Sequence, residues 1–337
     1  EPRLRLRGGS ALPAGFRAGA EIDLWMPGAD SRAQLEDGLS VEEVDALVGV
    51  PMGRPKSAAF RTADLVGLDT FAHVARTCLE AAAEAGIEVV VLDRPNPLGG
   101  GRVAGPPRAP MDEVPLSLLS RAPGPLVHGL TLGELARFGN RGLSPRVKLT
   151  VVTMRGWRRG MTWRDTGRVW IPPSPNLRSA DAALAYPGTC LIEATNVSEG
   201  RGTDTPFLLF GAPWLDPARI RVEVPGYRLV ETRFTPRSSP ASPAPKYAGR
   251  ECRGFRVEVS DPAAADPYRL GVEVLAALAA HPGFEWLDGG KALTRLVGTP
   301  RLGEHLAAGL SPEAIVAADE ADLTSWSDAR RTDLLYP

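Results

Sequence analysis

The chain has 337 residues, with 39 Lys and Arg against 40 Asp and Glu and a formal net charge of −1. Hydrophobic residues make up 43% and charged residues 23%, as in an ordinary globular protein with a sizeable core. This charge balance excludes the basic surface of a nucleic-acid binder, and no apolar run approaches the about 18 residues of a membrane span. At about 150 residues per domain, the length predicts two domains.

Clear periodicity begins at Leu68, from which apolar residues recur at helical spacing until Gly86, a residue placed to end the helix. Ile87–Leu92 follows as an apolar, β-branched run, which is typical of a strand inside a parallel sheet. The run stops at the polar and rigid turn Asp93–Pro97. In open α/β sheets, ligands bind at such carboxyl ends of strands.

Thr131 and Glu134 stand at capping-box spacing and predict the start of a helix, and Val147–Thr153 is typical of the next strand. This alternation predicts a parallel, layered α/β domain. The stretch 166–214 is dense in Pro, Gly, Asn, Ser and Thr, and we expect it to form ordered functional loops.

The pattern changes after Trp214. Val222 and Val224 predict a strand, and Phe255–Val259 alternates as a half-buried strand does. Asp266-Pro267 and Ser311-Pro312 each predict a helix start, with an N-cap followed by proline in the first turn. We therefore expect an α/β domain over 1–214 and a smaller α+β domain over 215–337.

Common catalytic motifs are missing from the sequence. It contains no GxSxG nucleophile elbow, no phosphate-binding P-loop and no HExxH zinc pair. Cys78, Cys190 and Cys252 lack CxxC spacing, so we expect no metal site. Gly99–Gly101 follows a strand but lacks GxGxxG spacing, which leaves a nucleotide-dependent enzyme as a minor alternative.

Four polar loops remain, and they hold the residue types that bind sugar hydroxyls and transfer protons: Asp93–Gly100, His128–Glu134, Pro172–Asn176 and Glu193–Thr203. Paired carboxylates are what glycoside hydrolysis needs, because one protonates the departing oxygen while the other attacks or activates water.

Read in chain order, longer blocks around these loops form a specific series: Val91–Gly100, His128–Ala136, Pro172–Asn176, Tyr186–Cys190, Glu193–Thr203 and Gly211–Trp214. The series resembles the exo-β-N-acetylmuramidase family (NamZ-type, glycoside hydrolase family 171). Lys246–Gly249 with Cys252, and the closing Leu334–Pro337, extend the resemblance, which covers about 70–337.

The resemblance implies a Rossmann-like domain, a smaller C-terminal domain and a cleft between them. It also implies release of N-acetylmuramic acid from non-reducing ends of peptidoglycan fragments such as MurNAc-GlcNAc, without a cofactor. Family members are typically exported or lipid-anchored, so an extracytoplasmic location is expected, although Glu1–Arg7 has no apolar signal core.

The start of the chain departs from the family pattern. Family members begin with further strand–helix units and carry a Glu-His-Gly-Phe-Arg-Gly block, whose nearest counterpart here is Pro13–Ala18. We therefore expect the first domain to be incomplete relative to the family. A catalytically impaired, muropeptide-binding relative is the alternative function.

Three residues are candidates for acid–base catalysis. Glu134 is either a catalytic carboxyl or only the capping residue of its helix, and His128 is a proton carrier or a donor to a sugar oxygen. Glu193 is the third candidate. At least one of Glu193 and Glu199 is expected to clamp its loop.

Candidate substrate-binding residues come from the same blocks. Asp93 is expected to bind sugar hydroxyls or to stabilise its turn, and either Arg94 or Arg201 is expected to hold the lactyl carboxylate of muramic acid. The remaining candidates are Asn96, Ser174, Asn176, Asn196 and Glu199.

Overall fold

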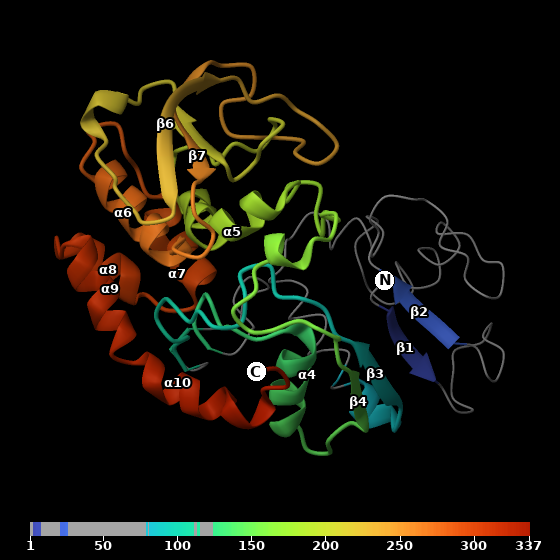
Figure 1. Ribbon diagram of the computed structural model, residues 1–337. Coiled ribbons are helices and arrows are strands. Elements are labelled where there is room, and N and C mark those ends of the chain that lie inside the picture. Colours follow the sequence, from blue (N-terminus) through green and yellow to red (C-terminus); the bar gives the residue numbers. More distant parts are fainter. Residues whose placement is uncertain (1–2, 8–20, 26–78, 80, 111–112, 115–123) are drawn as a thin grey trace.

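The computed structural model describes residues 3–7, 21–25, 79, 81–110, 113–114 and 124–337 (Figure 1). The helix expected from Leu68 is described only at 79 and 81–85, and it ends at Gly86 with a φ of +65°, as predicted. The expected counterpart of the early family block, Pro13–Ala18, lies outside the described residues.

A four-stranded sheet has the order β2-β1-β3-β4, with β1 at Arg3–Arg7, β2 at Glu21–Trp25, β3 at Glu88–Leu92 and β4 at Leu149–Val152. β3 and β4 are parallel, which confirms the strand pairing expected from the alternation of strand, helix and strand. The sheet is mixed because β1 runs antiparallel to both β2 and β3.

Helix α4, Leu132–Arg141, packs against this sheet. Its capping box is present: the Thr131 hydroxyl accepts from the Glu134 amide, while the Glu134 carboxylate accepts from the Thr131 amide. Buried Val89, Val91, Ala136 and Val147 join the strands to the helix in one apolar cluster. This packing fixes the end of β3 beside the start of α4.

A second, antiparallel sheet has the order β5-β7-β6, formed by Leu209–Ala212, Cys252–Val259 and Tyr227–Phe234. The alternating Phe255–Val259 is thus confirmed as a strand. The expected strand at Val222 and Val224 is wrong, because residues 221–224 are irregular and β6 starts only at Tyr227.

Helices account for most of the chain after β7: α6 at Pro267–Ala279, α7 at Lys291–Val297, α8 at Arg301–Ala307, α9 at Pro312–Glu320 and α10 at Leu323–Arg330. Asp266 and Ser311 cap α6 and α9 as predicted. Figure 1 shows α10 running back toward α4, where the end of the chain lies. No helix among the described residues combines the length and apolar character that crossing a bilayer requires.

Stretch 166–214 is more regular than the loops expected from its composition. It contains α5, Ala180–Thr189, a 3-10 helix at Cys190–Ala194, and β5. Pro187 and Gly188 are both helix-breaking types, yet both lie in α5. A Cβ on Gly188 would stand 2.7 Å from the Gly271 amide of α6, so glycine is required for these two helices to pack closely.

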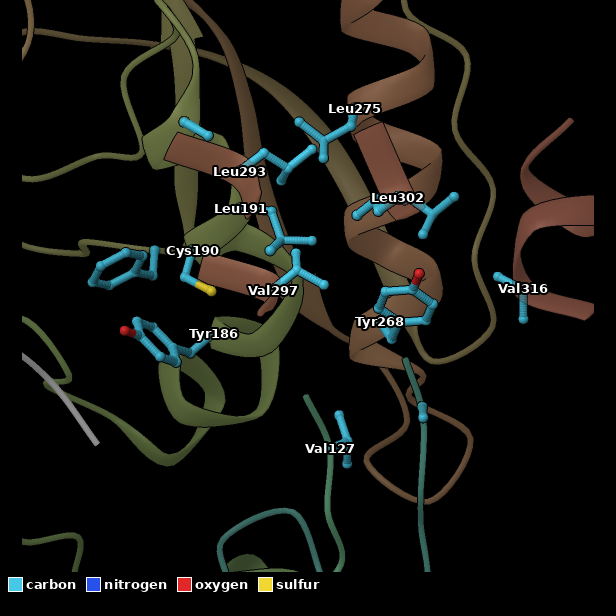
Figure 2. Packing of buried hydrophobic residues seen from close by; sticks show 14 of the residues in the cluster. Val127, Tyr186, Cys190, Leu191, Tyr268, Leu275, Leu293, Val297, Leu302 and Val316 are labelled. Carbon is cyan, nitrogen blue, oxygen red and sulfur yellow. The ribbon is translucent and has the colours of Figure 1, made fainter. Parts of the chain in front are cut away.

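One core cluster joins α5 and the Cys190–Ala194 helix to α6, α7, α8 and α9. In Figure 2, Tyr268 and Leu275 of α6 face Leu191, Leu293 and Val297 across this core. Val127, from the segment before α4, also packs here and links the core to the polar loops. Cys190 and Cys252 are both buried, and Cys78 lies outside the described residues.

Candidate active site

Asp93 lies at the carboxyl end of β3 and accepts four hydrogen bonds. Its Oδ1 accepts from the amides of Arg94 at 2.9 Å and Gly133 at 2.8 Å. Its Oδ2 accepts from the hydroxyls of Thr131 at 2.7 Å and Tyr336 at 2.5 Å. A carboxylate has about four acceptor positions, so Asp93 is satisfied within the protein.

Glu134 is fully buried, with none of its surface exposed. One oxygen accepts from the Thr131 amide at 2.9 Å, and the other accepts from the Leu335 amide at 2.8 Å and from the Arg159 guanidinium. The carboxylate therefore caps α4 and binds Arg159 at the same time. Among the described residues, both oxygens of the Glu134 carboxylate therefore contact protein groups.

His128 precedes this helix. Its Nδ1 accepts from the Leu130 amide at 3.0 Å, which places the proton of the neutral ring on Nε2. Burial, with a further contribution from Arg330, lowers the pKa of His128 to about 4. The ring is consequently neutral near pH 7, where it can donate a hydrogen bond from Nε2 but is not an imidazolium that could release a second proton.

The loop after Asp93 is held by Asn96. Its side-chain amide donates to the Leu130 carbonyl at 2.9 Å, and its Oδ1 accepts from the Leu98 amide at 3.0 Å. Arg94 lies between Asp93 and Asn96, and burial lowers the pKa of its guanidinium to about 10 against the opposing effect of Asp93. Asp93, Arg94, Asn96, His128 and Glu134 thus form one group, termed the strand-end group.

The remaining candidates gather around Arg201, in a second group termed the Arg201 group. Its guanidinium lies 3.3 Å from a Glu193 carboxylate oxygen and 3.5 Å from Glu199, and it stacks over the Phe207 ring at 4.9 Å. Glu199 also pairs with Lys246 at 3.1 Å. Two carboxylates and two cations therefore share this group.

Exposure separates the two carboxylates. The Glu199 side chain is 4% exposed, whereas that of Glu193 is 28% exposed. Burial raises the pKa of Glu193; the charges of Arg201 and Lys246 oppose this rise, and that of Glu199 adds to it. Glu193 thus combines a partly exposed carboxyl with a raised pKa, and a raised pKa is the direction of shift that suits a general acid.

Asn196, Ser174 and Asn176 hold loops in place. The Asn196 side chain donates to the Gly283 carbonyl at 2.8 Å and accepts from the Glu285 amide at 3.1 Å. The buried Asn176 donates to the Ala241 carbonyl at 3.0 Å, and its own amide donates to the Ser174 hydroxyl. Asn196 lies beside the Arg201 group. Ser174 and Asn176 lie together against the 239–242 turn, which Asn176 contacts at the Ala241 carbonyl.

Several residues in contact with these groups were not among the predicted site residues: Thr131, Arg159, Lys246, Tyr247, Arg330 and Tyr336. One signal in the sequence points to Lys246. The chain uses arginine for nearly all its cations, and lysine occurs only at 56, 148, 246 and 291. In the structure the Lys246 ammonium donates to the carbonyls of Ile192, Glu193 and Val197 at 2.9–3.2 Å.

The two groups are connected through packing. Leu98, near the end of the Asp93 loop, packs against the cluster that contains Ala194, the residue that follows Glu193. Among the described residues, there is no cluster of three or more His, Cys, Asp or Glu side chains that could bind a metal ion.

Comparison with known proteins agrees with these blocks. Residues 66–181 match the family model "Exo-beta-N-acetylmuramidase NamZ, N-terminal", and residues 184–336 match the corresponding C-terminal model. The chain is 33% identical over 316 residues to the peptidoglycan beta-N-acetylmuramidase NamZ of Bacillus subtilis, a match that covers 87% of this chain and 74% of that protein. The chain belongs to the NamZ family.

A solved structure supports the same assignment. A DUF1343 family protein from Bacteroides fragilis superposes with a TM-score of 0.70 at 26% identity, covering 80% of this chain and 71% of that one. A short stretch is also 60% identical over 48 residues to a probable 3-hydroxyacyl-CoA dehydrogenase of Bacillus subtilis, but it covers only 6% of that protein. The NamZ match spans most of the chain and places it in a family of glycoside hydrolases.

Proposed function

We propose that this chain is an exo-acting glycoside hydrolase that releases N-acetylmuramic acid from non-reducing ends of peptidoglycan fragments. The relative from Bacillus subtilis is named a peptidoglycan beta-N-acetylmuramidase, and the two matching family models are named for an exo-beta-N-acetylmuramidase. The observation in this chain that supports it most is Glu193, an accessible carboxyl whose pKa is raised beside Arg201 and Glu199.

Glu193 is the general acid in this proposal. A glycosidic oxygen is a poor leaving group until it receives a proton, so the acid must still be protonated near neutral pH. Burial and the charge of Glu199 both favour the protonated form of Glu193. Glu199 is almost fully buried and paired with Lys246, so its role is to hold Arg201 and to keep the Glu193 pKa high.

Arg201 is placed to bind an anionic group of the substrate. Its stacking on Phe207 and its pairing with both carboxylates fix the guanidinium plane, and a fixed guanidinium binds a carboxylate through two parallel hydrogen bonds. The lactyl carboxylate of muramic acid fits this chemistry. Attack at the anomeric carbon then comes from a second carboxylate, from activated water, or from the 2-acetamido group of the substrate.

The strand-end group supports the site in this proposal. Because Asp93 and Glu134 accept hydrogen bonds from protein groups, they fix the end of β3 and the start of α4. The His128 ring donates a hydrogen bond from Nε2 to a sugar oxygen. We further propose a Rossmann-like domain over 1–214, a smaller domain over 215–337, a cleft between them and an extracytoplasmic location, where peptidoglycan fragments arise.

The test measures N-acetylmuramic acid released from MurNAc-β-1,4-GlcNAc by the purified chain and by its Glu193→Gln variant. Loss of a general acid lowers the rate by about 10²–10⁴-fold. The same variant should lose far less activity on a 4-nitrophenyl glycoside of MurNAc, whose leaving group needs no proton. Glu258→Gln, at an exposed pair with Arg228, is the matched control and should retain full activity on both substrates.

The outcomes separate the alternatives. Equal loss on both substrates would contradict the general-acid role of Glu193. Absence of release by the parent, together with a melting temperature raised by the disaccharide, would instead identify a muropeptide-binding protein without turnover.

A further inference from the structure

Residues 330–337 return to the strand-end group from the far end of the sequence. The Tyr336 hydroxyl donates to Asp93 at 2.5 Å and accepts from the Met154 amide at 3.1 Å. The Leu335 amide donates to Glu134 at 2.8 Å, and the Pro337 carbonyl accepts from the Arg159 amide at 2.8 Å. Two of these successive residues thus bind members of the strand-end group, and the third binds Arg159, the ion-pair partner of Glu134.

Arg330, the last residue of α10, anchors the start of the same segment. Its guanidinium donates to the Gly129 carbonyl at 2.6 Å and to the His128 carbonyl at 3.3 Å, and the Trp326 indole donates to the His128 carbonyl at 3.0 Å. The Tyr336 ring packs edge-on against Trp157 at 5.0 Å. The segment is therefore held by both polar and aromatic contacts, and Tyr336 is 8% exposed.

We propose that Tyr336 is a positioning residue for the hydrolase: by fixing the Asp93 carboxylate, it sets the placement of the Arg94–Leu98 and His128–Thr131 loops relative to substrate. The kinetic part of this inference rests on the proposed function. Its structural part concerns contacts within the chain and is tested separately.

Asp93 connects Tyr336 to both loops through hydrogen bonds of its two carboxylate oxygens. Through Oδ1 it holds the amide of Arg94, the start of one loop, and the amide of Gly133 in the first turn of α4. Through Oδ2 it holds the Thr131 hydroxyl, which ends the other loop. A carboxylate that rotates to replace a lost donor must therefore release at least one of these loops.

Removal of the Tyr336 hydroxyl leaves two partly buried groups without this partner, one acceptor of Asp93 and the Met154 amide. Buried polar groups rearrange to recover hydrogen bonds, because leaving them unpaired is costly. A displacement of about 1 Å in groups that orient a substrate can lower a rate by about 10²-fold. The small change from hydroxyl to hydrogen at position 336 is thus expected to act on catalysis without contact with substrate.

The experiment compares Tyr336→Phe with Tyr227→Phe in the full chain. Tyr227 is the matched control: it is 9% exposed and its hydroxyl donates at 2.9 Å to the Leu184 carbonyl, in a different core cluster. The first readout is hydrogen exchange of the Arg94 and Gly133 amides. The second is kcat and KM on MurNAc-β-1,4-GlcNAc.

We expect exchange at Arg94 and Gly133 to accelerate at least about tenfold in Tyr336→Phe and to stay within twofold in Tyr227→Phe. The value of kcat/KM should fall at least about tenfold in the first variant only, mostly through KM, because the displaced loop carries Arg94. Unchanged exchange in Tyr336→Phe overturns the positioning role. Faster exchange with unchanged kinetics overturns its coupling to the reaction.

A second variant approaches Asp93 from the opposite side. A Cβ on Gly133 would stand 2.5 Å from Cγ1 of Val151, 2.9 Å from the Asp93 carboxyl carbon and 3.0 Å from Oδ2, so Gly133→Ala displaces the carboxylate together with the Val151 side chain. The inference expects the same rise in KM as in Tyr336→Phe, and a normal KM in a folded Gly133→Ala contradicts it. If the parent releases no N-acetylmuramic acid, the proposed function fails, and hydrogen exchange alone still decides the structural part.

Discussion

Replacement of Lys246 by Met tests whether the Arg201 group depends on its partly buried lysine. The ammonium donates to three backbone carbonyls and pairs with Glu199 at 3.1 Å, and methionine keeps the length of the side chain without any donor. The variant leaves Glu199, 3% exposed, with Arg201 at 3.5 Å as its remaining ion-pair partner among the described residues.

The expected loss follows from these contacts. Removing one partner of a buried ion pair costs about 3–5 kcal/mol, and the 24% exposure of the Lys246 side chain favours the lower end, about 3 kcal/mol. Since domains are stable by only about 5–15 kcal/mol, a loss of this size shifts the unfolding midpoint clearly. Urea denaturation at pH 7, followed by circular dichroism, measures it.

Two comparisons make the test specific. Lys148→Met removes a lysine whose side chain is 78% exposed and pairs with Glu88, and it should cost at most about 1 kcal/mol. Adding Glu199→Gln to Lys246→Met should restore about 1–2 kcal/mol, because it removes a buried charge that has lost the closer of its two partners. A loss below about 1 kcal/mol in Lys246→Met, or no recovery in the double variant, would refute this account of the group.

Three further outcomes follow from the carboxylates and the histidine. Glu134→Gln should lower the free energy of unfolding by about 3 kcal/mol in urea, since Arg159 and the Leu335 amide lose a charged acceptor; an unchanged midpoint would contradict this. Because the pKa of Glu193 is raised, the folded state binds this proton more tightly than the unfolded state does. The parent should therefore lose stability relative to Glu193→Gln as the pH rises above 4.5. Parallel pH profiles of stability for the two proteins would contradict this prediction. The His128 ring should titrate near pH 4 by NMR, and its contribution to stability should be lost as pH falls from 6.5 toward 4; a midpoint near 6.5 would show that the ring is not desolvated.

Local signals in the sequence predicted the elements that position the site. The apolar run before Asp93 became β3, and the Thr131–Glu134 spacing became the capping box of α4, because both depend on residues within one turn or one strand. The caps Asp266 and Ser311 were equally readable. Each of these signals acts over a few residues and needs no knowledge of the rest of the fold.

Helix α5 was not predicted because its composition reflects a distant partner. Pro187 and Gly188 suggest a loop when read locally, and only the approach of Gly271 explains why a small residue is needed there. The same limit applies to the acid–base candidates. Sequence spacing cannot show whether the Glu134 carboxylate faces substrate or protein. The answer depends on how many hydrogen-bond donors surround the carboxylate. For Glu134 these donors include Arg159 and the Leu335 amide, which lie far from it in the sequence.

The contact between Tyr336 and Asp93 also bears on the order in which the protein is made. These two residues are separated by 243 positions, so at about 5–20 residues per second the ribosome adds the donor roughly 12–49 s after its acceptor. Throughout that interval the β3–α4 unit carries two carboxylates, Asp93 and Glu134, whose donors at Tyr336 and Leu335 have not yet been synthesised. The strand-end group can therefore reach its final form only after Leu335 and Tyr336 have been synthesised, so its assembly cannot be completed when the β3–α4 unit first leaves the ribosome.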